Sequence, residues 1–342
     1  MPAVHHASDC GRLSPGKRAD ARTGRTVLSI GLVNNMRETA LAATERQFSK
    51  LLRTAAGAIP IRLSFYALPG VPRSDDEIRR IRCNYGSLED LWNSPPDGLI
   101  VTGAEPSTAQ LSDEPYWTSL SSLIDWAERS TISSVWSCLA AHAAVLHLDG
   151  IDRRRLSEKL VGVFPCRKAQ GSPLESRLLA GIPELLRLPH SRWNDVSRRA
   201  GFALEGSLYR VLTWSDEAGV DAFVRRGRSL FVCFQGHPEY EAETLLLEYR
   251  RDIRRFLAGH ASQYPAMPSG YFDAEAIAAL QRYREHALCE PAPKLLEEFP
   301  ISMLAARVRN VWRAAAVTFY RNWLSYLQES RAKTIAPGAI QR

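Results

Sequence analysis

Residues 135–144, Val-Trp-Ser-Cys-Leu-Ala-Ala-His-Ala-Ala, join an apolar stretch to an alanine-rich one at Cys138. The pattern predicts a buried strand over Ser133–Ser137 and a helix directly behind Cys138. A side chain at such a turn lies at the carboxyl edge of a sheet, where open α/β folds bind ligands. The helix N-terminus lowers the pKa of a thiol there and offers backbone N–H groups to an oxyanion. Cys138 is therefore a candidate nucleophile, and a buried structural thiol is the alternative.

Strand-like and helix-like segments alternate on the N-terminal side of this turn. Apolar residues at helical spacing predict one helix through Leu41 to Leu52 and another over Tyr116–Glu128. Strands that alternate with helices form a mainly parallel sheet covered by helices on both faces, an α/β fold. The strands predicted in this half are Val27–Val33, Ile59–Tyr66, Gly98–Thr102 and Ser133–Ser137.

The second half of the chain has a different pattern. Three short runs separated by turn residues predict an antiparallel extension of the sheet, and a helix over Glu241–Leu257 follows them. An apolar stripe predicts a last long helix over about Ser302–Glu329, and such a stripe belongs to a core or to an oligomer interface. The three strands of the extension are Leu208–Trp214, Val220–Arg225 and Ser229–Phe234.

These patterns predict a single domain over residues 27–330, with a C-terminal helical extension over 270–330. Residues 1–26 lack the apolar centre of a secretion signal and are interpreted as a disordered leader, and residues 331–342 as a flexible tail. No run approaches about 18 uninterrupted apolar residues, so no transmembrane helix is expected. Because no export signal is visible, the expected location is the cytoplasm.

The formal net charge of +7 raises the question of a nucleic-acid partner. The arginines are scattered, as at Arg79, Arg153 and Arg225, and no nucleic-acid recognition motif accompanies them. This favours a solvated, arginine-rich surface, whose positive field attracts an anionic molecule such as a CoA thioester. The six cysteines form no Cys-x-x-Cys pair, so no zinc ribbon, dithiol redox site or metal site is expected.

A second motif, GHPEY at Gly236–Tyr240, closely follows the predicted strand that ends at Phe234. A histidine at a strand end, with a carboxylate two residues later, supplies a general base and a group that fixes its tautomer. A lone His-x-Glu is common by chance, but its combination with a cysteine at another strand end is not. The sequence therefore predicts Cys138 as nucleophile, His237 as base and Glu239 as the group that orients the base.

The order of short motifs resembles that of the homoserine O-acyltransferases, the homoserine O-succinyltransferase family, which shares this Cys and His arrangement with class I glutamine amidotransferases. The matches run in order over roughly residues 28–328, nearly the whole chain. The resemblance implies a class I glutamine amidotransferase-like fold. The matching motifs are DGLIVTGA at 97–104, YW at 116–117, DW at 125–126, EKLVGV at 158–163, PHSR at 189–192, GHPEY at 236–240, RD at 251–252 and NWL at 322–324.

The resemblance also implies a reaction. Cys138 attacks an acyl-CoA thioester, and the hydroxyl of homoserine then attacks the acyl-enzyme, a step of methionine biosynthesis. His237 takes the proton from each nucleophile in turn, and the backbone N–H of Leu139 belongs to the oxyanion site. No cofactor is implied as bound: acyl-CoA is a co-substrate, the other partners are small molecules, and a homodimer is expected.

Three further positions carry implied roles. Lys159 and Ser191 line the site, and Arg251 holds the carboxylate of the amino acid. An arginine suits that role because its planar guanidinium binds a carboxylate through two hydrogen bonds. The alternatives are a surface lysine, a turn serine and an arginine on the surface of a helix.

One position just beyond the TGA segment goes with the choice of acyl donor in the family, Gly with succinyl and Glu with acetyl. In this chain the position is Ser107, so neither rule applies. A small serine leaves room for the longer succinyl chain and slightly favours succinyl-CoA. Homoserine is the default acceptor, and serine is the alternative.

The chain departs from the family at several positions. Asn34–Thr39 replaces a segment with a proline and lysines that helps to build the oxyanion site, and Leu139 stands where Trp is frequent. His142 stands where Gln is familiar and is interpreted as a packed helix residue. These departures leave open a repurposed or non-catalytic member that serves secondary metabolism. A glutamine amidotransferase is a further alternative, although Trp136 and Ala140 replace the glycines of its Gly-x-Cys-x-Gly turn.

Overall fold

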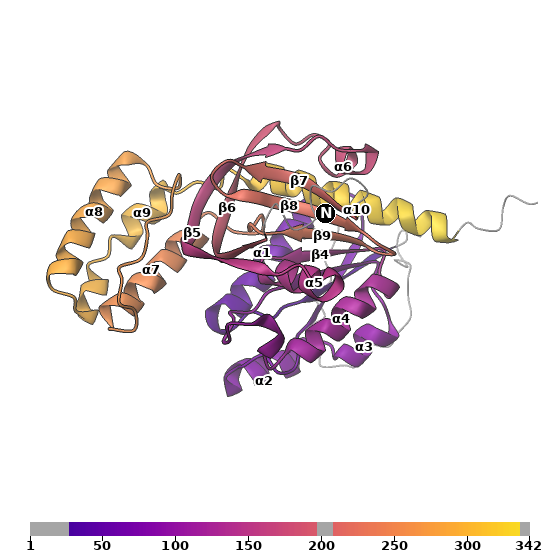
Figure 1. The fold of residues 1–342 in the computed structure, drawn as a ribbon, viewed down its shortest axis with the longest axis horizontal. Coiled ribbons are helices and arrows are strands. Elements are labelled where there is room, and N and C mark those ends of the chain that lie inside the picture. Colours follow the sequence, from indigo (N-terminus) through magenta and orange to yellow (C-terminus); the bar gives the residue numbers. More distant parts are fainter. Residues whose placement is uncertain (1–26, 197–207, 336–342) are drawn as a thin grey trace, which may run out of the picture.

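A nine-stranded mixed sheet forms the centre of the protein (Figure 1). The computed structural model describes residues 27–196 and 208–335. The strand order is β2-β1-β3-β4-β9-β8-β7-β5-β6, parallel from β2 to β9 and antiparallel from β9 to β6. The strands are β1 (Leu28–Val33), β2 (Ile61–Tyr66), β3 (Gly98–Thr102), β4 (Ser133–Ser137), β5 (Arg153–Lys168), β6 (Leu185–Val196), β7 (Tyr209–Ser215), β8 (Gly219–Arg226) and β9 (Leu230–Phe234).

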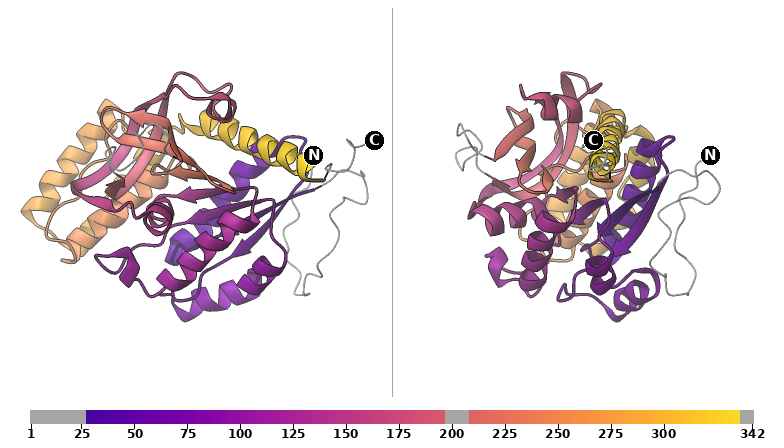
Figure 2. Two further views of the ribbon diagram at one scale, coloured as in Figure 1. Left: turned by 45° about the vertical axis from the view of Figure 1, so that its right-hand side comes forward. Right: turned by 90° about the vertical axis from the view of Figure 1, so that its right-hand side faces the viewer.

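Helices cover both faces of the sheet, so the α/β fold predicted from the sequence is confirmed (Figure 2). The α-helices are α1 (Glu38–Ala56), α2 (Asp75–Asn84), α3 (Leu88–Asn93), α4 (Trp117–Ser130), α5 (Leu139–Asp149), α6 (Pro173–Leu178), α7 (Thr244–Leu257), α8 (Ala274–Cys289), α9 (Ile301–Arg307) and α10 (Arg313–Ile335). Two short 3-10 turns span Leu111–Asp113 and Pro293–Glu297.

Alternation along the central strands builds two cores. In β3, Ile100 packs into the core formed with α1 and α10, while Leu99 and Val101 pack into the core formed with α4 and α5. Because successive strand residues point to opposite faces, an unbroken apolar run is buried on both. Helices α1 and α10 lie side by side. The rings of Phe48 and Tyr320 pack edge to face between them, with their centroids 6.4 Å apart.

The C-terminal helices divide between two places. Helices α7, α8 and α9 pack on one another in a lobe with its own core at one end of the sheet, and α10 returns to the sheet (Figure 1). The single helix predicted over Ser302–Glu329 is wrong, because the chain breaks between α9 and α10. In the break, Asn310 and Trp312 both donate to the carbonyl of Tyr240, at 3.0 and 2.9 Å. In the sequence the apolar spacing continues across the break through Val311, which conceals the break, but the structure leaves that residue 55% exposed.

Two long strands, β5 and β6, were not predicted. The first half of β5 is largely exposed, and its pairing with β6 shifts register between Arg155 and Leu160, so no clean alternation marks it. The predicted antiparallel extension also needs a correction. Strand β9 is antiparallel to β8 but parallel to β4, and it therefore belongs to the central parallel part.

The structure describes the expected ends of the domain only in part. The expected leader, residues 1–26, and residues 336–342 lie outside the described residues. Helix α10 continues to Ile335, past the expected start of the tail at 331, and the buried Arg331 donates to Asp97 and to the carbonyl of Val27, both at 2.8 Å. Among the described residues, none of the helices is long and apolar enough to cross a membrane.

Candidate active site

Cys138 lies at a sharp turn between β4 and α5, as predicted. Its φ of 52° and ψ of −113° make it the only described residue other than glycine with a positive φ. Its backbone N–H donates to the carbonyl of Phe234 in β9 at 2.7 Å, which ties the turn to the neighbouring parallel strand. A non-glycine residue in this conformation costs about 1–3 kcal/mol and persists only where its surroundings hold it. Strained turns of this kind hold nucleophiles in α/β enzymes.

His237 and Glu239 lie where the adjacent strand, β9, ends. The Nδ1 atom of His237 lies 2.9 Å from Oε1 of Glu239. The thiol of Cys138 is close enough to the imidazole to be among the groups that raise its pKa. The backbone N–H of His237 donates to the carbonyl of Pro189 at 2.8 Å, which fixes the loop. The structure thus brings the predicted nucleophile, base and orienting carboxylate into one chain of contacts. Such a chain can move a proton away from a thiol and return it.

The surroundings of His237 favour its protonated form. Burial lowers the pKa of the imidazole, but the charges of Glu239 and Cys138 and the hydrogen bonds to both outweigh burial and hold that pKa well above its usual value. Glu239 is 4% exposed, and Ser137 donates to its Oε1 at 3.3 Å. Its Oε2 is buried with no hydrogen-bond partner among the described residues. The imidazolium is therefore the nearest group that balances the carboxylate charge.

Leu139 is the first residue of α5, and its backbone N–H faces Gly103 at the end of β3. A Cβ atom on Gly103 would lie 2.7 Å from the Cβ of Leu139 and 3.2 and 3.3 Å from the N atoms of Leu139 and Ala140. Only glycine leaves these two amides uncovered. Amides at a helix N-terminus beside a nucleophile are suited to stabilise an oxyanion.

The segment that departs from the family, Asn34–Thr39, packs against β3. The N–H of Asn35 donates to the hydroxyl of Thr102 at 2.8 Å, and its side-chain amide donates to the carbonyl of Thr102 at 2.9 Å. Asn35 is 2% exposed, and its Oδ1 accepts from the N–H of Leu68 at 3.1 Å. The new residues therefore anchor this loop beside Gly103.

Lys159 and Arg251 meet at one carboxylate. The Nζ atom of Lys159, on β5, lies 2.7 Å from Oδ2 of Asp252, and Arg251 donates through Nε and Nη2 to Oδ1 at 3.1 and 3.0 Å. Burial raises the pKa of Asp252, but the two cations outweigh burial and hold that pKa below its usual value. Two cations share this charged carboxylate, and the charges of Glu248 and Glu105 also act on Arg251.

Ser191 meets a carboxylate that sequence reasoning missed. Its hydroxyl donates to Oε2 of Glu248 at 2.5 Å, and the hydroxyl of Tyr240 donates to Oε1 at 2.5 Å. The ring of Tyr240 stacks on His237 with centroids 4.3 Å apart, so the contacts continue to the base. The sequence offered one signal for this residue: Glu248 lies one turn before Arg251 on the predicted helix, so the two side chains share a helix face.

Ser107 lies in the loop after β3, where its N–H and hydroxyl donate to the buried Glu114 at 2.7 and 2.8 Å. His142 is packed in α5 as expected, 3% exposed, with Nε2 at 2.9 Å from Oε1 of Gln235. Burial lowers the pKa of His142 to about 3, so this imidazole is neutral at ordinary pH. Among residues 27–196 and 208–335, no group of three or more His, Cys, Asp or Glu side chains is arranged to hold a metal ion.

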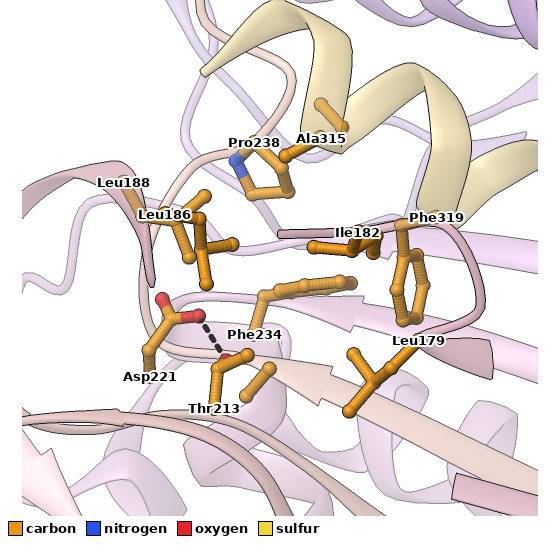
Figure 3. Close-up of a pocket in the computed structure, with 12 residues that line it drawn as sticks. Leu179, Ile182, Leu186, Leu188, Thr213, Asp221, Phe234, Pro238, Ala315 and Phe319 are labelled. Carbon is orange, nitrogen blue, oxygen red and sulfur yellow. Dashed lines mark hydrogen bonds between the residues drawn. The ribbon is translucent and has the colours of Figure 1, made fainter. Parts of the chain in front are cut away.

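The loop with His237 rests on a buried layer. Pro238 and Phe234 line a small apolar cavity between the sheet and α10, and Asp221 lies at its edge, where its Oδ2 accepts from Thr213 at 2.6 Å (Figure 3). His190, which is fully buried, lies 3.2 Å from Oδ1 of Asp221. Burial lowers the pKa of His190. This packing supports the turn after β9 on the side that faces α10.

Comparison with known proteins shows the family of this chain. The family model of the homoserine O-succinyltransferases matches residues 12–333. A protein named homoserine O-succinyltransferase from Rhodopseudomonas palustris is 47% identical over 311 residues, 91% of this chain and 90% of that protein. Another of that name from Bradyrhizobium japonicum is 45% identical over 303 residues, 88% of this chain and 90% of that protein. The chain belongs to the homoserine O-succinyltransferase family.

Membership of the homoserine O-succinyltransferase family makes the chain an acyltransferase and confirms the resemblance stated from the motifs. The glutamine amidotransferase alternative is thereby set aside. Among solved structures, a glutamine amido transferase from Methylobacillus flagellatus is similar, with a TM-score of 0.49 and 17% identity, covering 88% of this chain and 95% of that one.

Proposed function

We propose that this chain transfers the succinyl group of succinyl-CoA to the hydroxyl of L-homoserine through a thioester on Cys138. The observation that carries the proposal is the strained turn at Cys138, which a backbone hydrogen bond ties to the strand that leads to His237, together with the 2.9 Å contact between Nδ1 of His237 and Glu239. The names of the relatives supply the acceptor and the acyl group. The reaction belongs to methionine biosynthesis in the cytoplasm.

In the first half-reaction, His237 holds the proton of the Cys138 thiol, and the thiolate attacks the thioester carbon of the donor. The N–H groups of Leu139 and Ala140 stabilise the tetrahedral oxyanion. These N–H groups are accessible because Gly103 has no side chain to cover them. When the intermediate collapses, the bond to the CoA sulfur breaks and His237 protonates the leaving thiolate. The succinyl group remains on Cys138.

In the second half-reaction, the hydroxyl of homoserine attacks the thioester on Cys138 while His237 accepts its proton. The carbon–sulfur bond breaks, Cys138 leaves as the thiolate, and the thiolate and imidazolium are restored as a pair. Glu239 stabilises the imidazolium in both halves because it lies against Nδ1. One base thus serves two nucleophiles, as a ping-pong transfer requires.

The charges around α7 match an amino acid as acceptor. Arg251 and Lys159 would hold the carboxylate of homoserine, and Glu248 would hold its ammonium group with Ser191 and Tyr240 as neighbours. A zwitterion held at both ends has one orientation, which directs its hydroxyl toward the stacked pair of Tyr240 and His237.

Mass spectrometry of the intact protein tests the proposal. Wild-type protein exposed to succinyl-CoA is expected to gain one succinyl mass on Cys138 and to lose it on addition of homoserine, with O-succinylhomoserine as the product. Cys138→Ala should gain no mass and transfer nothing while its thermal unfolding stays close to that of wild type. More than a few per cent of wild-type activity in Cys138→Ala would contradict covalent catalysis. Faster discharge by serine than by homoserine would instead identify a repurposed family member.

A further inference from the structure

Arg153, the first residue of β5, is a partly buried arginine whose guanidinium reaches the loop between β3 and α4 and lies within electrostatic range of Cys138. Among the described residues it forms no ion pair, and its guanidinium makes one hydrogen bond, from Nη2 to the carbonyl of Ala109 at 3.4 Å. Burial lowers the pKa of Arg153, and the neighbouring groups Tyr116, Asp152, Glu114 and Cys138 oppose that change. A partly desolvated guanidinium without a carboxylate partner is costly unless a ligand supplies one.

The nearby carboxylate, Glu114, is already occupied. Its Oε1 accepts from the N–H of Ser107, the N–H of Thr108 and the hydroxyl of Thr108 at 2.7, 2.8 and 2.8 Å, and its Oε2 accepts from the hydroxyl of Ser107 at 2.8 Å. Burial raises the pKa of Glu114, but these hydrogen bonds outweigh burial and lower that pKa. Glu114 therefore stays charged and fixes the loop with Ser107, while the guanidinium of Arg153 keeps donors for another anion.

A second polar group beside Arg153 lacks a partner. Tyr116 is 1% exposed, and its hydroxyl is buried with no hydrogen bond among the described residues. Burial and the charge of Glu114 raise the pKa of Tyr116, and Arg153 opposes them, so the three groups share one electrostatic environment. An unpaired buried hydroxyl beside an unpaired guanidinium is the arrangement that a carboxylate completes.

We infer that Arg153, with Tyr116 beside it, binds the terminal carboxylate of a dicarboxylic acyl group and so sets the choice of acyl donor. The inference rests on the proposed function. The succinyl carboxylate is three carbon–carbon bonds from the thioester carbon, roughly 4 Å away in an extended chain, which suits an arginine close to the nucleophile. Acetyl-CoA has no such carboxylate and gains nothing from Arg153. Ser107 acts indirectly, through the loop that Glu114 holds.

Two donors of equal length test this role. Succinyl-CoA and butyryl-CoA differ only in a terminal carboxylate or methyl group, so both carry the phosphates of CoA. Rates of acylation of Cys138 are measured by quenched-flow mass spectrometry for wild type, Arg153→Gln, Arg153→Lys and Tyr116→Phe. Arg154→Gln is the matched control, because Arg154 is the next residue of β5 and is exposed.

Arg153→Gln is expected to lower kcat/KM for succinyl-CoA by about 10- to 100-fold, the loss typical of a charged hydrogen bond, and to change that for butyryl-CoA by less than about threefold. Arg153→Lys should retain part of the preference for succinyl-CoA over butyryl-CoA. Tyr116→Phe should lower the ratio of the two kcat/KM values by about three- to tenfold. Arg154→Gln should behave like wild type.

Equal losses with the two donors would show that Arg153 contacts CoA or supports the fold, and unchanged rates would place it on an ordinary surface. Either result overturns the inference. If Arg153→Gln does not fold, an unchanged succinyl preference in both Arg153→Lys and Tyr116→Phe overturns it. Wild-type protein that acquires no acyl group from either donor would refute the proposed function and this inference with it. Acylation without transfer to homoserine would refute the acceptor alone, because the donor comparison remains valid.

Discussion

The ring of Tyr240 stacks on the imidazole of His237, with centroids 4.3 Å apart and planes 15° apart. The hydroxyl of the same tyrosine donates to Glu248 at 2.5 Å, and its carbonyl accepts from Trp312 at 2.9 Å. One residue of the GHPEY motif thus joins the base, the carboxylate of α7 and the segment that leads into α10. Orientation of the base and binding of the acceptor are therefore physically connected, and their contributions can be separated by mutation.

Glu248→Gln is expected to affect the acceptor alone. The amide oxygen of glutamine can accept from one of the two hydroxyls, its NH2 group can donate to the other, and the side chain no longer attracts an ammonium group. Discharge of the acyl-enzyme by homoserine should therefore slow by roughly 10- to 100-fold. Acylation by succinyl-CoA should stay within about threefold of wild type. Single-turnover measurements of each half-reaction separate the two, and Glu243→Gln, an exposed position at the start of α7, is the control. Equal slowing of acylation would mean that Glu248 supports the loop of His237 instead.

Arg251→Ala removes the cation that we propose holds the acceptor carboxylate. The KM for homoserine should rise by roughly 10-fold or more, while acylation by the donor survives. Arg251 is 44% exposed at its side chain, so solvent screening keeps this effect below that of a buried pair. Arg254→Ala, exposed on the same helix, should change nothing. An equal loss in both half-reactions would assign Arg251 to the fold or to the donor.

His237→Ala should slow both half-reactions, and deacylation more than acylation. A hydroxyl has a far higher pKa than a thiol, so the second nucleophile depends more on a general base, whose help is typically worth ~10²–10⁴-fold. Acyl-enzyme should therefore accumulate, and Glu239→Gln should show the same pattern more weakly. Rapid-quench mass spectrometry measures the accumulation. A His237→Ala protein that discharges its acyl group at the wild-type rate would move the search for the base to His142 or His190.

Gly103→Ala should impair acylation without altering the charges of the residues around the site. The new Cβ would lie 2.7 Å from the Cβ of Leu139 and cover the amides at the start of α5. We expect about 1–3 kcal/mol loss of unfolding free energy from overpacking, and a fall of kcat beyond what stability explains. Gly31→Ala is the control, because the three atoms nearest its new Cβ belong to the side chains of Leu99, Pro96 and Tyr66, away from the amides of α5. If both variants lose activity in proportion to stability, the proposed oxyanion role of these amides is wrong.

His142→Gln should make the protein more tolerant of acid. The pKa of His142 is lowered to about 3 in the folded protein, whereas an unfolded histidine has a pKa of about 6.5. The unfolded state therefore binds a proton first, and folding free energy is lost by about 1.4 kcal/mol per pH unit as pH falls from about 6.5 towards 3. Urea unfolding at pH 7 should give nearly the same free energy of unfolding for wild type and variant. At pH 5 the free energy of unfolding of the variant should exceed that of wild type by about 2 kcal/mol, relative to the difference at pH 7. A difference independent of pH would show that His142 does not titrate in this way.

The sequence by itself determined the family of this protein and the alternation of its central elements, and it predicted the candidate nucleophile and base. Cys138 at a strand end and GHPEY at another were readable because each motif is contiguous, and the bounds of β3 and β4 followed from short apolar runs that local propensity decides. The order of motifs identified the family, which the comparisons confirmed.

Only the tertiary structure decided what lies opposite each functional group. The contacts of Ser191 with Glu248 and of Lys159 with Asp252 join residues 57 and 93 positions apart, and no local pattern pairs such residues. The break between α9 and α10 likewise involves hydrogen bonds to the distant Tyr240, while the sequence keeps its apolar spacing there through the exposed Val311. Periodicity records which face of a helix is buried, and the fold alone determines which partner buries it.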